Sequence, residues 1–364
     1  MKVLPAPQLE ECTPPRDDTV AQAPVGGSAA PRSRLRSTLL RGLVSFSLLG
    51  FFLLQMDWGE FLRILGEARW SLIFLAVLLH ALTVLPSVTR WRSIVRPFGM
   101  QTPWSGLFRI CMIGYFFNLL LPSAIGGDLA RAYYLSRRER SGFTCCLICT
   151  AVDRLAGLFA MVLIALTANF IWPARVGPWP ASLLLSALAG GFLIITLSVF
   201  HPWFHRLWER LLVRMGLSSA LDRFQLISEG LQRLRHNVRA VAVVVGSSLV
   251  IQFTVIVALW LVARSIGVEG PFSLFLVFIP LVNLSVAIPL TINGMGVREL
   301  MYLFLFSQLG VGMETAVMLS WLNLLVVAGT ALPGGLVYSF YKGTPDFPET
   351  DFGRLTDAPS HDSA

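Results

Sequence analysis

The sequence predicts an all-α, polytopic helical membrane protein with about seven to nine membrane segments. Hydrophobic residues make up 55% of the chain, charged residues only 14%, and the mean hydropathy is +0.67. A soluble domain has about 25% charged residues, so much of this apolar surface must face lipid. Stretches close to the ~20 residues of a spanning helix recur along the chain. Two of the apolar regions are interrupted by Pro and Gly, which predicts one or two re-entrant or broken helices.

The apolar pattern divides the chain into a membrane domain, 39–341, and two polar tails. Residues 1–38 are rich in Pro and Arg and predict a disordered cytoplasmic tail, and 342–364 predict a second disordered tail. The first apolar run follows the N-terminus too late for a cleavable signal peptide, so none is expected. The uninterrupted candidates for spanning helices are 42–56, 70–89, 155–172, 180–200, 238–262 and 314–341.

Arginines set the expected orientation, because basic loops stay in the cytoplasm. The segment 201–240 is the most arginine-rich loop and predicts a basic amphipathic cytoplasmic helix that binds anionic inner-leaflet lipids. Arg32, Arg34 and Arg36 place the N-terminus on the same side. The net charge of +8 therefore indicates a membrane surface and no nucleic-acid partner.

The interrupted region 105–127 has basic flanks on both sides, with arginines at 90–96 before it and at 137–140 after it. Both flanks are expected in the cytoplasm, which a single crossing cannot achieve. The pattern therefore predicts a re-entrant segment that enters the membrane and returns. For 272–296, a full crossing predicts a cytoplasmic C-terminus, and a second re-entrant segment predicts an external one.

A short motif occurs twice, at 122–131 and at 289–298, with an offset of 167 residues (289 minus 122). Pro, Ile, Gly and Arg coincide at this offset, and in both copies Pro, Gly and Arg follow an apolar run. Three expected crossings lie between the copies, so the second would be inverted relative to the first. Inverted repeats with broken helices near the midplane are typical of many secondary transporters.

The chemistry of this motif suits an anion. A helix that restarts after Gly126 and Gly127 directs free N–H groups toward the break. Arg131 and Arg298 would supply planar guanidinium groups that match a phosphate. The alternative is that the breaks are only kinks and that each arginine extends to a lipid headgroup at the surface. The presence of both copies favours a site at which the two arginines converge.

Two adjacent charges, Asp153 and Arg154, lie inside the apolar run 143–172. Each costs about 2.5–3.5 kcal/mol at the centre of a spanning helix. Because adjacent residues of a helix do not face each other, the two need partners on other segments. We expect Arg131 to pair with Asp153 and Asp128 with Arg154. The alternative is an ion network with a purely structural role.

Catalytic, metal and cofactor sites are not expected. The chain has five cysteines, an odd number, and Cys145, Cys146 and Cys149 are best explained as small packing residues. The sequence has no Gly-rich phosphate loop, no metal-ligand constellation and no nucleophile elbow. A membrane-embedded transferase that uses Asp128 or Asp153 as a base is therefore a weaker alternative to a transporter.

Three motifs, Asn118 through Arg131, Asp153 through Leu158 and Pro289 through Glu299, resemble the flippase-like membrane family. That family is similar to the N-terminal transmembrane domain of lysylphosphatidylglycerol synthases, and the resemblance covers roughly residues 40 to 341. Asp153 stands where the family usually has Glu, and Asn293 where it has a second Gly. Aminoacyl-lipid synthases carry a soluble domain after the membrane part, whereas little sequence follows Tyr341. The resemblance thus implies lipid translocation without synthesis.

The sequence therefore predicts translocation or handling of a lipid with an anionic headgroup, either a phospholipid or a polyprenyl-linked intermediate, across the cytoplasmic membrane of a bacterium. The alternative is a membrane partner or scaffold of an envelope glycosyltransferase or lipid synthase. The candidate substrate-binding residues are Asn118, Pro122, Gly126, Gly127, Asp128, Arg131, Asp153, Arg154, Asn293, Gly294 and Arg298.

Overall fold

A computed structural model describes most of the predicted membrane domain. The predicted tails, Pro122, Asn293 and all of 201–230 except Arg210 lie outside the described residues, so the expectations for them stay predictions. The described residues are 47–121, 126–139, 141–173, 175–176, 179–200, 210, 231–287, 291 and 294–341.

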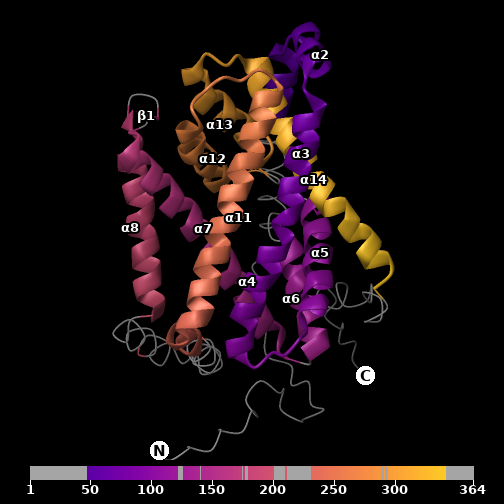
Figure 1. Ribbon diagram of the computed structural model, residues 1–364, viewed down its shortest axis with the longest axis vertical. Coiled ribbons are helices and arrows are strands. Elements are labelled where there is room, and N and C mark those ends of the chain that lie inside the picture. Colours follow the sequence, from indigo (N-terminus) through magenta and orange to yellow (C-terminus); the bar gives the residue numbers. More distant parts are fainter. Residues whose placement is uncertain are drawn as a thin grey trace, which may run out of the picture.

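Long apolar helices run side by side along the long axis of the molecule (Figure 1). Within the described residues, four helical stretches are long and apolar enough to cross a membrane, and the first joins α3 and α4 into one stretch, Trp70–Phe98. The prediction of a polytopic helical membrane protein is confirmed. The elements of this frame are α3 (Trp70–Leu82), α4 (Val84–Val95), η1 (Arg96–Phe98), α7 (Phe143–Ile171), β1 (Arg175–Val176), β2 (Trp179–Pro180), α8 (Ala181–Phe200), α11 (Val238–Ser265) and α14 (Met313–Ser339).

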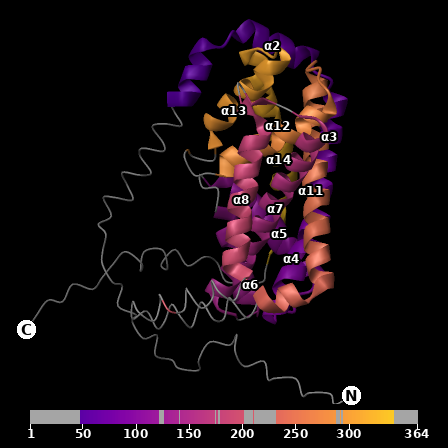
Figure 2. The same ribbon diagram turned by 90° about the vertical axis from the view of Figure 1, so that its left-hand side faces the viewer.

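A short helix, α2 (Trp58–Glu67), lies across one end of the bundle (Figures 1 and 2). Asp57 begins it by accepting hydrogen bonds from the backbone N–H groups of Gly59 and Glu60, the usual N-cap arrangement. The helix is also stabilised by the exposed ion pair between Arg63 and Glu60. We call this end of the bundle the α2 end. The distribution of arginines predicts that this end is external.

Two short helices, α5 (Trp104–Leu120) and α6 (Gly126–Glu139), form a hairpin in the half of the molecule opposite the α2 end (Figure 1). Their 17 and 14 residues give lengths of about 26 and 21 Å at 1.5 Å per residue. Neither spans a hydrocarbon core of about 30 Å. The two helices lie side by side and pack tightly where Gly114 meets Gly127. This is the re-entrant geometry that the basic flanks of 105–127 predict.

A second hairpin, α12 (Phe272–Ala287) and α13 (Val297–Phe306), occupies the half near the α2 end (Figure 1). Gly294 and Gly296 have φ angles of 74° and 85° before α13 begins, in the left-handed region that favours glycine. The two hairpins therefore enter the bundle from opposite ends. Helices also start at matched positions in the two halves. α11 begins 168 residues after α3 (238 minus 70), and α12 begins 168 residues after α5 (272 minus 104). This arrangement supports the inverted repeat.

The last helix, α14, crosses from the α2 end to the end that contains the first hairpin. Near its start, the Trp321 ring lies 5.4 Å from that of Phe61 on α2, and near its end Tyr338 lies 5.3 Å from Phe117 on α5. The α12–α13 hairpin returns to its starting end, so α14 alone decides the side of the C-terminus. The C-terminus itself lies outside the described residues, but the expectation that a re-entrant 272–296 leads to an external end is wrong for the last described helix, because α14 ends on the same side as α4 (Figure 1).

Two apolar cores hold the bundle together, one near the α2 end around Phe275 and Phe306 and one around Trp91 on α4. The α7 cysteines are buried in the second core, as expected for packing residues. No cluster of His, Cys, Asp and Glu in the described residues could hold a metal ion. Many large apolar side chains lie on the outside, where a lipid surface would accommodate them: Leu54, Phe74, Phe170, Ile194 and Leu336 are at least half exposed.

The orientation can be tested with introduced cysteines in a Cys12→Ser background, because the four described native cysteines are buried. A cysteine at Glu67, exposed on α2, is expected to react with an impermeant maleimide in intact cells. Cysteines at Arg138 and Ser339 should react only after permeabilisation, since both positions lie at the opposite end. External labelling at position 138 would show that α5 and α6 together cross the membrane.

Candidate functional site

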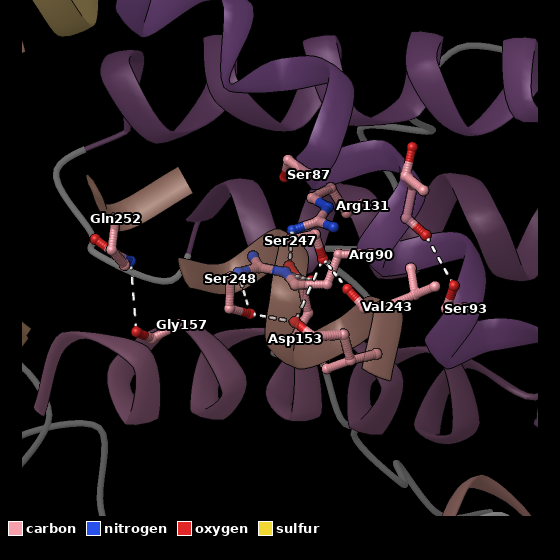
Figure 3. Close-up of polar contacts among 12 residues, drawn as sticks. Ser87, Arg90, Ser93, Arg131, Asp153, Gly157, Val243, Ser247, Ser248 and Gln252 are labelled. Carbon is pink, nitrogen blue, oxygen red and sulfur yellow. Dashed lines mark hydrogen bonds and ion pairs between the residues drawn. The ribbon is translucent and has the colours of Figure 1, made fainter. Parts of the chain in front are cut away.

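A buried carboxylate, that of Asp153 on α7, binds arginines of two other helices, and one of these arginines contacts a third helix (Figure 3). Its Oδ1 accepts a hydrogen bond from Arg90 Nε of α4 at 2.7 Å, and its Oδ2 accepts one from Arg131 Nη1 of α6 at 3.0 Å. Arg90 Nη1 also donates to Ser248 Oγ of α11 at 3.2 Å. Asp153 and Arg90 are only 3% and 7% exposed, so the contacts lie inside the protein.

A second carboxylate, Asp128 in the first turn of α6, extends this cluster. Its Oδ2 lies 2.7 Å from Arg154 Nε, and its Oδ1 lies 3.9 Å from Arg131 Nη1. The predicted pairs, Arg131 with Asp153 and Asp128 with Arg154, are both confirmed. The five residues alternate in charge in the order Arg90, Asp153, Arg131, Asp128, Arg154. We call these five residues the charge network.

The charge network contains one more cation than anions, with three guanidinium groups and two carboxylates. Two nitrogens of Arg131, Nε and Nη2, are buried and have no hydrogen-bond partner among the described residues. The Trp91 ring, whose centroid lies 4.2 Å from the guanidinium carbon of Arg131, offers a cation–π contact, and the nearby Cys111 thiol is only a weak acceptor. Within the described residues, Arg131 therefore keeps two buried N–H donors that no side chain or backbone group accepts.

From Asp153 to Arg154, the exposure of the side chains increases along the charge network. Asp153 is almost fully buried, whereas the side chain of Arg154 is 40% exposed. Asp128 links the two regions, because it contacts both the buried Arg131 and the exposed Arg154. An anion that approaches from outside the bundle would thus meet Arg154 first and Arg131 next.

A hydrogen bond joins Asn118 near the end of α5 to Gly127 at the start of α6. The Asn118 Oδ1 atom accepts a hydrogen bond from the Gly127 N–H at 2.9 Å. A Cβ at Gly127 would collide with the carbonyl oxygen of Gly114 and with the Asn118 side chain. Gly127 is therefore required for close packing of α5 on α6, and one of the N–H groups expected to bind an anion already has an acceptor.

The second arginine of the repeated motif, Arg298, has a separate set of partners. Its Nε donates to Ser320 Oγ of α14 at 2.7 Å, and its Nη2 donates to Glu299 Oε1 at 3.1 Å. Glu299, 1% exposed, also accepts the backbone N–H of Gly296 at 2.7 Å. None of these partners is shared with Arg131, so the two arginines belong to two distinct networks, one for each hairpin.

The offset of 167 residues that pairs Arg131 with Arg298 also pairs Asp153 with Ser320. In both halves, an arginine on the returning helix of the hairpin donates to the next long helix. The carboxylate that pairs with this arginine differs between the halves: in the second half it is that of Glu299, on the same helix as the arginine. The halves therefore share an architecture, but the surplus cation lies only in the first.

Sequence reasoning missed Arg90, Ser248, Glu299 and Ser320. The prediction of orientation placed Arg90 in a cytoplasmic flank together with the other arginines of 90–96. This placement is incorrect, because Arg90 is buried and ion-paired with Asp153. Its position in an apolar helix was the available signal, since a charge at such depth requires a partner. The two serines carried no comparable signal.

Comparison with known proteins places the chain in a family. A family model described as the lysylphosphatidylglycerol synthase TM region matches residues 38–332. The chain belongs to this family. The match includes both hairpins and every residue of the charge network, so these features lie within the family's transmembrane region.

Three archaeal proteins are similar to this chain. A UPF0104 membrane protein of Methanothermobacter thermautotrophicus is 24% identical over 339 residues, which cover 86% of this chain and 94% of that protein. A UPF0104 membrane protein of Methanocaldococcus jannaschii is 29% identical over 105 residues, and the match covers 31% of its length. The glycosyltransferase AglD of Haloferax volcanii is 30% identical over 146 residues, which cover 38% of this chain and 23% of AglD. No solved structure matches the chain.

Proposed function

We propose that the protein translocates a lipid with an anionic headgroup across the cytoplasmic membrane. The observation that carries the proposal is the surplus of one cation in a buried charge network that extends to the partly exposed Arg154. Membership in the lysylphosphatidylglycerol synthase TM region family supports a lipid as the ligand. The sequence predicts that this membrane is that of a bacterium, and we keep this as part of the proposal; the three relatives above are archaeal.

The physical problem for such a transporter is that a phosphate loses its water when it leaves the membrane surface. An ionised group in hydrocarbon is very costly unless it is paired and hydrogen-bonded. Guanidinium groups replace water well, because they form charge-assisted, bidentate hydrogen bonds with phosphate oxygens. Arg131, with two buried nitrogens that lack partners in the described region, is the group best suited to this role.

We further propose that the protein is not an enzyme. A transferase would need a carboxylate with an oxygen free to accept a proton from the substrate. Both oxygens of Asp153 accept hydrogen bonds from arginines, and both oxygens of Asp128 lie within 4 Å of an arginine nitrogen. The guanidinium groups therefore already engage the oxygens that would have to accept a proton from a substrate.

A second candidate function is that of a membrane partner for an envelope glycosyltransferase or lipid synthase. The match to AglD, a glycosyltransferase, over 38% of this chain is the observation that favours it. The exposed arginines Arg233, Arg235 and Arg239 would bind anionic lipids of the inner leaflet in either role. A partner protein needs no lipid movement, so a transport assay separates the two functions.

The test is translocation by the purified full chain in reconstituted vesicles. Fluorescent phosphatidylglycerol, a polyprenyl phosphate and phosphatidylcholine would be compared, with the label on each lipid quenched from outside. We expect faster exchange of the two anionic lipids than in protein-free vesicles, and little exchange of the zwitterionic phosphatidylcholine. Rates equal to those of empty vesicles for all three lipids would reject transport of these lipid classes and favour the partner function.

A further inference from the structure

The two carboxylates of the charge network are held differently. Asp153 binds two arginines at hydrogen-bond distance, 2.7 and 3.0 Å, and is almost fully buried. Among the described residues, Asp128 has one close partner, Arg154 at 2.7 Å, and it lies 3.9 Å from Arg131, beyond hydrogen-bond distance. Asp153 is thus held by two hydrogen-bonded arginines, whereas Asp128, which is also buried, is held by one.

Asp128 also occupies the place that an incoming anion needs. It lies between Arg154, the exposed end of the network, and Arg131, whose Nε and Nη2 have no partner among the described residues. An oxyanion bound to these two arginines would carry its negative charge close to that of Asp128. Like charges at such separation in a dry environment repel strongly, so both cannot stay there.

We propose that Asp128 is an internal competitor of the substrate anion and that the headgroup phosphate displaces it from Arg131 and Arg154. This inference rests on the proposed function. With a phosphodiester in place of Asp128, the three guanidinium groups again face two anions, so the exchange keeps the charge balance of the network. Return of Asp128 to the two arginines then lowers the affinity for the phosphate and promotes its release.

The competition has a physical advantage for a transporter. Two guanidinium groups in a dry site would hold a phosphate tightly, and a tightly held substrate leaves slowly. The Asp128 carboxylate on α6 competes for the same two arginines and so lowers the affinity for the phosphate, and no second ligand is needed. Coupling between two binding sites typically changes affinity by about 5- to 150-fold, and we expect the removal of Asp128 to change the affinity for the phosphate by an amount in this range.

The experiment measures binding of dihexanoyl phosphatidylglycerol to the detergent-purified full chain by calorimetry, with dihexanoyl phosphatidylcholine as the zwitterionic control. Asp128→Asn, which keeps the size but removes the charge, is expected to bind phosphatidylglycerol at least about fivefold more tightly than wild type. In vesicles saturated with phosphatidylglycerol, the same variant should translocate more slowly because release becomes limiting. Affinity for phosphatidylcholine should stay unchanged.

Two controls distinguish competition by Asp128 from an effect of the changed net charge and from misfolding of the variant. Glu67→Gln makes the same change in net charge on the exposed surface of α2 and should leave binding unchanged. Asp128→Ser is a second neutral variant, for use if Asp128→Asn does not fold. A folded neutral variant at position 128 that binds phosphatidylglycerol no more tightly than wild type overturns the competition. An equal increase in affinity in the Glu67→Gln variant also overturns it. Lack of both binding and transport in wild type and in the neutral variants would instead reject the proposed function.

Discussion

Replacement of Asp153 by alanine is expected to lower the free energy of unfolding by about 3–5 kcal/mol, the usual cost of removing one partner of a buried ion pair. The change leaves Arg90 with Ser248 as its remaining described side-chain partner, and it leaves Arg131 with Asp128 at 3.9 Å. Since neither arginine can reach bulk water from its buried position, the lost acceptor is not replaced. The measurement is the thermal unfolding midpoint and the yield of monodisperse protein in detergent.

The structure also predicts which second change rescues the variant. Arg131 keeps Asp128 nearby, so Arg90 is the cation left with the poorer environment. The double variant Arg90→Ala/Asp153→Ala should therefore be more stable than Asp153→Ala alone. It should also be more stable than the double variant Arg131→Ala/Asp153→Ala. Glu67→Ala, on the exposed surface, is the matched control and should unfold like wild type. Stability changes that simply add in the double variant would show that Arg90 and Asp153 are not coupled.

Replacement of Arg131 by lysine is expected to reduce phosphatidylglycerol translocation at least about tenfold, a loss close to one charge-assisted hydrogen bond of about 1.5–3 kcal/mol. Lysine keeps the charge but has a single nitrogen. It cannot pair with Asp153, lie flat on the Trp91 ring and present two further N–H donors at once. The expected result is thus a selective loss of transport, measured in reconstituted vesicles and normalised to incorporated protein.

The matched control is Arg239→Lys, at an exposed position in the first turn of α11. A charge that only faces lipid headgroups works equally well as guanidinium or ammonium, so this variant should transport like wild type. The thermal midpoint of Arg131→Lys should be recorded as well, because the pair with Asp153 also stabilises the bundle. Wild-type transport rates in a folded Arg131→Lys variant would show that the planar guanidinium is not needed and would exclude Arg131 as the phosphate-binding group.

Several features of the fold follow from the sequence alone, because the membrane restricts what a chain can do. Apolar runs of spanning length must be helices, since backbone groups in lipid require internal hydrogen bonds. Basic flanks on both sides of 105–127 require a segment that returns, and the structure contains the α5–α6 hairpin there. The pairs Arg131–Asp153 and Asp128–Arg154 could be predicted because charges at membrane depth need partners and few candidates exist.

Other features depend on how the helices pack, which local sequence does not specify. Arg90 meets Asp153 only because α4 lies against α7 and α11, and the sequence separation of 63 residues gives no sign of this. Asn118 became an acceptor for Gly127, and Arg298 found Glu299 and Ser320, because close packing decides which polar groups remain available. The sequence by itself thus determined the helices, their breaks and the need for ion pairs. The tertiary structure decided the partners, since long-range contacts are set by the arrangement of whole helices.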